Sequence, residues 1–316
     1  MALLPEQTAF VFPGQGSQAT GMGMALSEAA PEAARVFQLA DKILGFPLSQ
    51  VCWHGPEIDL NSTQYTQPAL LTHSIAVLEV FKAKYPDFTP ACTAGHSLGE
   101  YSAMVAAGAM SFDDALLLTR ERGEAMRYAG EIHTGGMSAV LGLDIQEVEG
   151  ACDEASTQSG GTVAIANDNC PGQVVISGDE NALALAHDLL ESAGARKVIR
   201  LAVSIASHSP LMVPAQDRLN EAIAAASFHD PLIPVVGNVS ARPLSSTEEI
   251  REDLSAQLTS RVRWTESIGW MAHSGVVNFI ELGSGTVLTG LLRRIDGQAR
   301  GISLDSPPTW DTFKLS

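Results

Sequence analysis

The chain has 316 residues, of which 45% are hydrophobic and 17% are charged, and its formal net charge is −17. This composition is typical of a soluble globular α/β protein with a sizeable core, and the negative charge disfavours nucleic acid and anionic membranes as partners. The N-terminus lacks the basic flank and apolar run of a secretory signal, and no uncharged stretch reaches membrane-spanning length, so we expect a cytoplasmic protein without membrane contact.

Strands and helices are predicted to alternate in the first part of the chain. Residues 9–12 form a short apolar run that ends at a proline and a glycine-rich turn, which predicts a buried strand. Residues 69–78 have the apolar spacing of a mostly buried helix, with Pro68 at its first helical position. A predicted strand at residues 91–95 is followed without a spacer by a sharp turn and a helix at residues 100–107. This alternation predicts an α/β layer.

The rhythm of the predicted elements changes at about residue 136. Strands are predicted at residues 137–143, 162–166, 174–177 and 197–201, and helices at residues 144–155 and 181–192. The order β-α-β-β-α-β is typical of a ferredoxin-like unit, so we predict a small domain inserted into the larger one. A helix through residues 219–226 and strands at residues 234–236 and 277–280 resume the larger layer, and the last dozen residues predict a surface tail.

The four cysteines are widely spaced and form no C-x-x-C pair: they are Cys52, Cys92, Cys152 and Cys170. This spacing argues against a disulfide framework, a redox pair or a zinc knuckle, and it predicts reduced, mostly buried thiols. No H-E-x-x-H motif or other paired ligand spacing occurs, so the sequence predicts no metal site.

The sequence Gly95-His96-Ser97-Leu98-Gly99 matches the pattern G-x-S-x-G. Small flanking residues let the backbone turn so sharply that the serine hydroxyl stands exposed above a sheet. The pattern is short and occurs by chance, but here it lies between a predicted strand and a predicted helix, which is the context that a nucleophilic serine requires. Ser97 is therefore the candidate nucleophile.

A serine nucleophile needs a base within hydrogen-bonding reach, and histidine is the usual one. His208 lies in a loop that follows a predicted strand and precedes a proline-started helix, where catalytic side chains are common, and it is the candidate base. His96 is adjacent to Ser97, and neighbouring side chains at such a turn diverge, so we predict a packing or hydrogen-bonding role for it. No acid that would complete a triad can be identified from spacing.

An acyl-transfer intermediate also needs two N–H donors for its oxyanion. The amide of Leu98, directly after the nucleophile, supplies the first. The glycine-rich loop Phe12-Pro13-Gly14-Gln15-Gly16-Ser17-Gln18 can bring a second amide close. The alternative interpretation, a phosphate cradle, is weak because the loop completes neither G-x-G-x-x-G nor G-x-x-x-x-G-K-[ST].

Several sequence blocks together resemble malonyl-CoA:acyl carrier protein transacylases and the related acyltransferase domains of fatty-acid and polyketide synthases. The resemblance spans nearly the whole chain and rests on Phe12 to Gln18, Thr66-Gln67-Pro68-Ala69, Gly95 to Tyr101, Arg122-Gly123, Pro171 to Gly178, Ser207-His208 and Val287-Leu288-Thr289-Gly290. It implies a hydrolase-like core with a mainly parallel sheet, at residues 1–131 and 203–316. It also implies an inserted ferredoxin-like small subdomain at residues 132–202.

The resemblance further implies the roles of single residues. Ser97 attacks the malonyl thioester, His208 accepts its proton, and the amides of Leu98 and Gln15 hold the oxyanion. Arg122 binds the free malonyl carboxylate. The chemistry supports this role, because a planar guanidinium offers two parallel hydrogen bonds that a lysine cannot reproduce. A backbone carbonyl near Gln257 orients the histidine in place of a carboxylate. Asn169 and His96 are weaker candidates beside the cleft.

The implied reaction is ping-pong transfer of malonyl from malonyl-CoA, through a malonyl-serine ester, to the phosphopantetheine thiol of acyl carrier protein. The alternatives are a serine hydrolase or thioesterase, a stand-alone polyketide-synthase acyltransferase, and a non-catalytic scaffold. We expect a monomer that has no permanently bound cofactor, takes malonyl-CoA as substrate and docks the carrier transiently by electrostatic attraction. The basic residues expected to form the docking face are Arg120, Arg122, Arg127, Arg196, Lys197, Arg200, Arg261, Arg263, Arg293 and Arg294.

Overall fold

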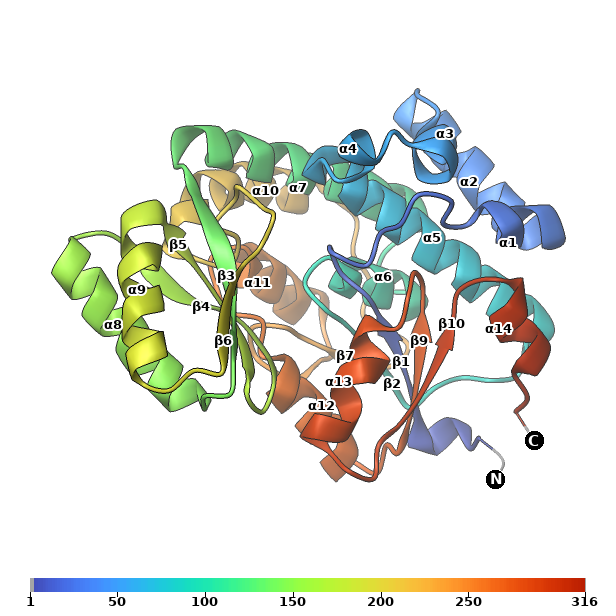
Figure 1. Ribbon diagram of the computed structural model, residues 1–316. Coiled ribbons are helices and arrows are strands. Elements are labelled where there is room, and N and C mark those ends of the chain that lie inside the picture. Colours follow the sequence, from blue (N-terminus) through green and yellow to red (C-terminus); the bar gives the residue numbers. More distant parts are fainter. Residues whose placement is uncertain (1–2, 316) are drawn as a thin grey trace.

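The computed structural model describes residues 3–315 and contains two α/β layers side by side (Figure 1). The larger layer holds a six-stranded sheet drawn from both ends of the chain, and the smaller holds a four-stranded sheet drawn from residues 135–200. This arrangement confirms the predicted fold class. The subdomain boundaries at residues 131/132 and 202/203 stay our proposal.

The larger sheet has the strand order β10-β9-β1-β2-β7-β8, and only the β7–β8 pair is antiparallel. Every residue of β1 and β9 is buried, as expected for parallel strands covered by helices on both faces. The strands are β1 (Thr8–Phe12), β2 (Cys92–Gly95), β7 (Val235–Val236), β8 (Pro243–Leu244), β9 (Asn278–Leu282) and β10 (Arg300–Leu304).

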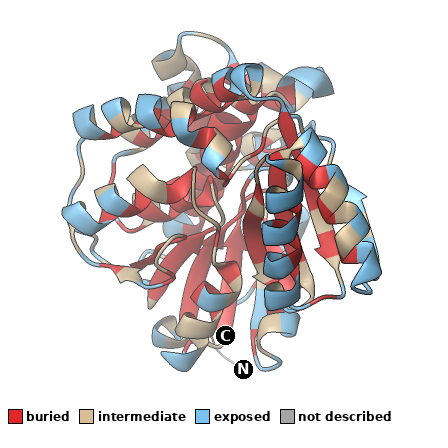
Figure 2. Ribbon diagram, turned by 90° about the vertical axis from the view of Figure 1, so that its left-hand side faces the viewer, coloured by how far each residue is buried: buried red, intermediate tan, exposed pale blue. Residues whose placement is uncertain are grey.

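Helices cover both faces of the larger sheet, so its strands lie in the interior, as the buried ribbon segments in Figure 2 show. Helix α5 (Thr63–Lys84) is the most buried of the long helices and packs on α7 (Phe112–Ile132). The other helices of this layer are α1 (Met24–Ala29), α2 (Pro31–Leu44), α3 (Leu48–His54), α4 (Glu57–Leu60), α6 (Gly99–Ala106), α10 (Val213–Ala225), α11 (Thr247–Gln257), α12 (Trp264–His273), α13 (Val287–Ile295) and α14 (Pro307–Thr312), with 3-10 turns at Pro5–Gln7 and Pro210–Met212.

The smaller sheet is antiparallel with the order β4-β5-β3-β6, which is the ferredoxin-like arrangement that the sequence predicts. Its elements are β3 (Gly135–Leu141), α8 (Ile145–Ser159), β4 (Val163–Cys170), β5 (Gln173–Asp179), α9 (Glu180–Ser192) and β6 (Lys197–Arg200). Helices α8 and α9 pack on one face and bury a separate apolar cluster. A capping box between Asp144 and Glu147 fixes the start of α8.

Backbone hydrogen bonds join the smaller layer to the larger one. Strand β4 pairs with the segment that precedes α12: Asp168 N–H donates to the Val262 carbonyl (2.9 Å), and Val262 N–H donates to the Ala166 carbonyl (2.8 Å). The Thr265 hydroxyl adds a hydrogen bond to Asp168 Oδ1 (2.7 Å). The end of β4 is therefore held next to the end of β2, where the predicted nucleophile lies.

The prediction for Pro68 is wrong. The helix begins at Thr63, so the proline lies inside it. A proline inside a helix lacks the N–H that would bind the carbonyl four residues earlier, here that of Gln64. Arg120 Nη1 donates to that carbonyl instead (2.8 Å), and its guanidinium stacks on the rings of Phe46 and Tyr65. This external donor lets the helix continue through the proline.

The prediction of a surface tail is also wrong for the residues that the structure describes. Residues 300–304 form edge strand β10, and residues 307–312 form helix α14. Phe313 is 8% exposed and packs edge-on against Tyr85 and beside Phe81. Burial of aromatic side chains therefore holds this segment against the core. The Pro307-Pro308 pair misled the prediction because proline, typical of loops, is also well suited to the first turn of a helix.

All four cysteines are free and buried, as predicted. Burial raises the pKa of the thiols of Cys52, Cys92 and Cys152 to about 12, so they stay protonated and inert near neutral pH. Over residues 3–315, none of the helices has the length and apolar character that would let it cross a membrane.

Candidate active site

Ser97 lies at a sharp turn between strand β2 and helix α6, as the sequence predicts. Its φ of +52° is left-handed, a conformation that costs a non-glycine residue about 1 kcal/mol. Gly95 is required here because a Cβ atom on it would lie 1.9 Å from the backbone of Gly99. A Cβ on Gly14 would lie 2.3 Å from the His96 carbonyl oxygen, so the glycine-rich loop after β1 packs directly against this turn.

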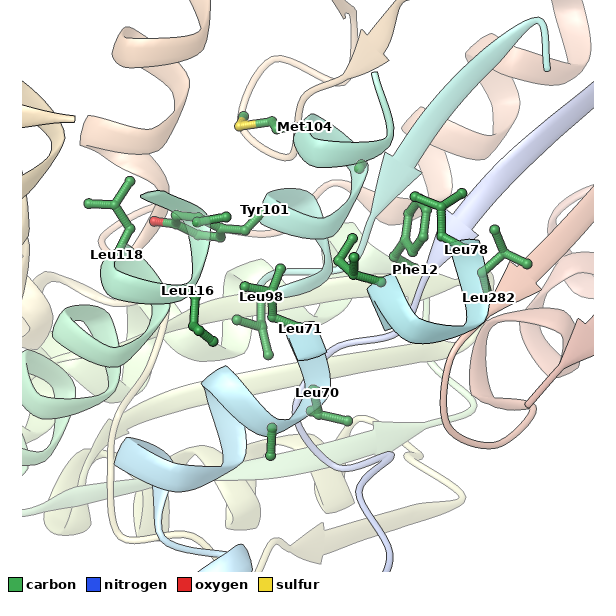
Figure 3. Close-up of a cluster of buried hydrophobic side chains, with 14 of the residues drawn as sticks. Phe12, Leu70, Leu71, Leu78, Leu98, Tyr101, Met104, Leu116, Leu118 and Leu282 are labelled. Carbon is green, nitrogen blue, oxygen red and sulfur yellow. The ribbon is translucent and has the colours of Figure 1, made fainter. Parts of the chain in front are cut away.

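The Leu98 side chain, directly after Ser97, anchors the turn to the hydrophobic core. Leu98 is 1% exposed and points into the core between α5 and α7, near Leu70, Leu71 and Leu116 (Figure 3). Its backbone N–H has no acceptor within residues 3–315, and neither has the N–H of Gln15. Two unpaired amides next to the candidate nucleophile are what an oxyanion hole requires.

His208 meets Ser97 across 111 residues of sequence. The distance between Ser97 Oγ and His208 Nε2 is 2.8 Å. On its other side, His208 Nδ1 lies 2.9 Å from the Gln257 carbonyl and 3.0 Å from the Ser260 carbonyl. Carbonyls only accept hydrogen bonds, so Nδ1 carries the proton and Nε2 is free to accept the serine hydroxyl.

The charge state of His208 follows from its surroundings. The pKa of His208 is lowered to about 3, mainly by burial and also by the positive charge of the nearby Arg122 guanidinium. The hydrogen bonds to Gln257 and Ser260 act in the opposite direction. The imidazole is therefore neutral near pH 7 and ready to act as a base. No carboxylate contacts it within the described residues, which agrees with the absence of a recognisable triad acid in the sequence.

Arg122 extends from α7 to the same point and is 1% exposed. Its Nη2 donates to Ser97 Oγ (3.0 Å) and to Gln257 Oε1 (2.9 Å), and its Nη1 donates to Gln67 Oε1 (2.8 Å). Burial lowers the pKa of Arg122, which the ring of Tyr101 and the carboxyl of Glu100 partly offset. Among residues 3–315, no carboxylate forms an ion pair with it. A buried guanidinium without such a partner suits a substrate carboxylate.

Gln67 holds Arg122 in place and links it to the glycine-rich loop. Gln67 Nε2 donates to the Thr63 hydroxyl (3.1 Å), and that hydroxyl donates to Gln15 Oε1 (3.0 Å). Gln67 lies in the motif Thr66-Gln67-Pro68-Ala69, which by itself predicts no role for it. Its importance follows only from the fold, because Gln67 and Arg122 lie on different helices.

His96 points away from the nucleophile, as expected for adjacent side chains at this turn. Its Nε2 lies 2.8 Å from Asn169 Oδ1, and its ring packs edge-on against Trp264 with centroids 5.6 Å apart. Burial lowers the pKa of His96. The pair joins the nucleophile turn to the end of β4, so Asn169 lies at the junction of the two layers.

A cleft of about 280 Å³ opens beside His208 between the two layers. Its walls come from α8 and β4 of the smaller layer and from the loops around His208 and Thr259 of the larger one, including Arg261. Of the site residues described above, His208 lines this cleft. In the described part of the chain, no group of three or more histidine, cysteine, aspartate or glutamate residues could hold a metal ion.

Half of the ten basic residues expected to form a docking face are paired with neighbouring carboxylates. Arg120 and Arg127 pair with Glu124, Arg200 with Glu180, and Arg261 and Arg263 with Glu266. Within residues 3–315, five of the set have no carboxylate partner at ion-pair distance: Arg122, Arg196, Lys197, Arg293 and Arg294. Of these, Arg122 is buried, and Arg294 donates to Gln173 Oε1 and to the Pro171 carbonyl. The positive surface available to a partner is smaller than the sequence predicts.

Known proteins that are similar to this chain belong to one family. A family profile described as "Acyl transferase domain" matches residues 9–302. The malonyl CoA-acyl carrier protein transacylase of Bacillus subtilis is 46% identical over 301 residues, which cover 95% of this chain and 94% of the relative. The protein with the same name from Escherichia coli K12 is 42% identical over 301 residues, with 95% and 96% covered.

Solved structures agree with these relatives. An acyl carrier protein S-malonyltransferase from Vibrio cholerae has a TM-score of 0.94 and 42% identity, and the match covers 98% of this chain and all of that one (100%). A malonyl-transacylase solved in complex with its type II PKS acyl-carrier protein has a TM-score of 0.93 and 41% identity, and the match covers 97% of this chain and 98% of the other.

Proposed function

This chain belongs to the acyl transferase domain family, and on that premise we propose that it transfers a malonyl group from malonyl-CoA to the phosphopantetheine thiol of acyl carrier protein. The relatives that carry this activity in their names match nearly the full chain. One observation carries the proposal: His208 Nε2 lies 2.8 Å and Arg122 Nη2 lies 3.0 Å from Ser97 Oγ.

In the first half-reaction, Ser97 Oγ attacks the thioester carbonyl of malonyl-CoA while its proton passes to His208 Nε2. The tetrahedral oxyanion receives hydrogen bonds from the amides of Leu98 and Gln15. Collapse breaks the carbon–sulfur bond, and the sulfur of coenzyme A leaves with the proton from His208. The product is a malonyl ester of Ser97.

In the second half-reaction, the thiol of the carrier's phosphopantetheine arm attacks that ester. His208 accepts the thiol proton and returns it to Ser97 Oγ when the carbon–oxygen bond breaks. The carbonyls of Gln257 and Ser260 hold the proton on Nδ1 throughout, so the same ring nitrogen serves both halves.

Arg122 supplies the selectivity for a dicarboxylic acyl group. A malonyl carboxylate beside the guanidinium replaces hydrogen bonds to neutral groups with charge-assisted ones and neutralises a buried positive charge. An acetyl group leaves that charge unpaired. The site therefore favours malonyl over acetyl, both on binding and in the ester.

A serine hydrolase could use the same nucleophile, base and oxyanion donors. The two functions separate when the protein is mixed with malonyl-CoA and holo carrier protein, and the products are resolved by mass spectrometry. Transfer predicts malonyl-carrier as the main product. Free malonate as the main product, without malonyl-carrier, would contradict the proposal and favour the hydrolase.

The relative solved with a type II PKS carrier favours a polyketide carrier as a second candidate acceptor, beside a fatty-acid carrier. Competition between one carrier of each kind in a single reaction decides which is preferred.

For transient docking of the carrier we propose the basic residues Arg196, Lys197 and Arg293. We predict that the KM for carrier rises with ionic strength, because salt screens such contacts.

The proposed mechanism uses only side chains and amides of this chain, so we further propose that the enzyme needs no permanently bound cofactor or metal. We also propose that it works in the cytoplasm as a monomer. Size-exclusion chromatography with light scattering tests the monomer, and metal analysis together with activity after chelation tests the cofactor proposal.

A further inference from the structure

Asn238 packs against the turn that carries the nucleophile. It lies in the loop after β7 and is 1% exposed. Its Oδ1 accepts a hydrogen bond from the Ser97 N–H (2.7 Å), and its Nδ2 donates to the Gly95 carbonyl (2.7 Å). The Asn238 side chain thus bridges the end of strand β2 and Ser97, from which it is 143 and 141 residues away in sequence.

The backbone of Asn238 is fixed as well. Its N–H donates to Glu100 Oε1 (2.8 Å), and its carbonyl accepts from the Arg263 N–H (3.0 Å). These contacts turn the Asn238 side chain toward the peptide backbone of the turn and away from a substrate. Any effect of Asn238 on the reaction therefore passes through Ser97.

Gln257 completes the hold on Ser97 from the other side. Its Nε2 donates to the Ser97 carbonyl (3.0 Å) and also contacts the Glu100 carboxyl. The two peptide groups that flank the Cα of Ser97 are thus both bound by side chains from distant segments. Fixing both groups maintains the φ of +52° that a serine otherwise avoids.

The loop that carries Asn238 is itself rigidly supported. Asp253 accepts hydrogen bonds from the N–H groups of Val239 (3.4 Å) and Ser240 (3.2 Å), and Arg263 Nη1 donates to the Val239 carbonyl (3.2 Å). Burial and the adjacent Asp253 carboxylate raise the pKa of Glu100 well above its usual range. A raised pKa favours the uncharged form of Glu100, which lowers the cost of placing both carboxyls in the core.

We propose that Asn238 is a positioning residue that holds Ser97 in the left-handed conformation from which its hydroxyl reaches His208. The inference rests on the proposed role of Ser97 as nucleophile. Without the Asn238 side chain, the Ser97 peptide relaxes and the Oγ to Nε2 distance lengthens, whereas Arg122, which we propose binds the malonyl carboxylate, is unchanged. We therefore expect acylation to slow, because a misplacement of about 1 Å costs up to about 100-fold in rate. Substrate affinity should stay the same.

The first test compares Asn238→Ala with the wild-type protein. Rapid mixing with malonyl-CoA, acid quench and intact-mass measurement give the rate of Ser97 acylation and its dependence on substrate concentration. We expect the maximal rate to fall by about 10-fold to 100-fold, with half-saturation changed by less than about twofold. A wild-type acylation rate in a folded Asn238→Ala protein overturns the inference.

A matched control separates positioning from general loss of stability. Asp41 accepts hydrogen bonds from the backbone N–H (2.8 Å) and hydroxyl (2.6 Å) of Ser49, and it ties α2 to α3 without touching the nucleophile turn. Asp41→Ala should lower the melting temperature but leave the acylation rate unchanged. An equal fall in rate for both variants at equal loss of melting temperature also overturns the inference.

A second variant decides the matter if Asn238→Ala does not fold. In Asn238→Asp, the protonated carboxyl can donate to the Gly95 carbonyl as the amide does, whereas the ionised form cannot. The charged or titratable groups that face this position are Glu100, Asp253 and Arg263, and all are retained. The acylation rate relative to wild type should rise as pH falls from about 8 to about 5. A ratio that does not change with pH contradicts the inference.

Ser97→Ala, measured in parallel, distinguishes failure of this inference from failure of the proposed function. Malonyl label on Ser97→Ala would remove Ser97 as nucleophile and with it the proposed function. An unlabelled Ser97→Ala protein together with a fully active Asn238→Ala protein would leave the function intact and remove only the role of Asn238.

Discussion

The carbonyl oxygen of Gln257 lies 2.9 Å from His208 Nδ1, in the place where a Ser-His-Asp triad has its carboxylate. A carbonyl fixes the tautomer of the imidazole but carries no full negative charge, so it stabilises the protonated ring less than a carboxylate does. The nearby Arg122 guanidinium disfavours the protonated ring further. The proposed base is therefore oriented toward Ser97 and weakly basic, and we expect it to stay neutral between proton transfers.

The rate of Ser97 acylation should depend on this neutral imidazole over a wide pH range. Because the pKa of His208 is lowered to about 3 by burial and by Arg122, the base stays unprotonated as pH falls below the ordinary histidine value of 6.5. We predict no histidine inflection in the acylation rate between about pH 8 and about pH 5. An inflection near 6.5 that His208→Ala abolishes would contradict the assigned environment.

Stability should respond to pH through the same residue. The unfolded chain takes up a proton on His208 near pH 6.5 and the native state only near pH 3, so the native state binds fewer protons between these values and loses stability as pH falls. His208→Gln removes this contribution. Its melting temperature should fall less than that of the wild type between pH 7 and about pH 4. Parallel curves for the two proteins would show that His208 does not titrate as described.

Arg122→Lys tests the recognition of the substrate carboxylate. A lysine keeps the charge but loses the paired geometry, so kcat/KM for malonyl-CoA should fall about 100-fold, equivalent to about 3 kcal/mol, while turnover of acetyl-CoA changes little. Arg127→Lys, on the exposed side of the same helix, should leave both unchanged. Equal losses for the two substrates would mean that Arg122 acts on Ser97 Oγ, which it also contacts, and not on the carboxylate.

Phe313→Ala tests the packing of the chain end. Phe313 is buried against Tyr85 and Phe81, so its loss should lower the free energy of unfolding by about 3 kcal/mol and leave kcat unchanged. The exposed neighbour Lys314 provides the control, since Lys314→Ala should change neither quantity. A loss below about 1 kcal/mol for Phe313→Ala would mean that the end of the chain contributes little to the fold.

The sequence was sufficient for the parts of the site that local patterns encode. The nucleophile turn has a strand before it, a helix after it and glycines at both ends, and all three are visible in residues 91–107. The order of elements in residues 137–201 likewise predicts the ferredoxin-like layer. The loop context indicated His208 as the candidate base, and the resemblance to a known family supplied the candidate roles of Arg122 and Gln257. The structure places all three around Ser97.

Other features depend on contacts that no local pattern encodes. The role of Asn238 depends on a loop folding back across 141 residues to reach the Ser97 amide. The helix through Pro68 depends on Arg120, which supplies the donor that proline lacks. The buried C-terminal segment depends on aromatic packing against α5. In each case the tertiary partner overrides the local preference, and spacing along the chain carries no signal of that partner.

The most direct test of the central claim is intact-mass measurement after brief exposure to malonyl-CoA, followed by peptide mapping of the modified protein. The account predicts a mass increase of one malonyl group on Ser97, discharged when holo carrier protein is added, and no increase in Ser97→Ala. A malonyl group on any other residue, or transfer to the carrier by Ser97→Ala at the wild-type rate, would contradict it.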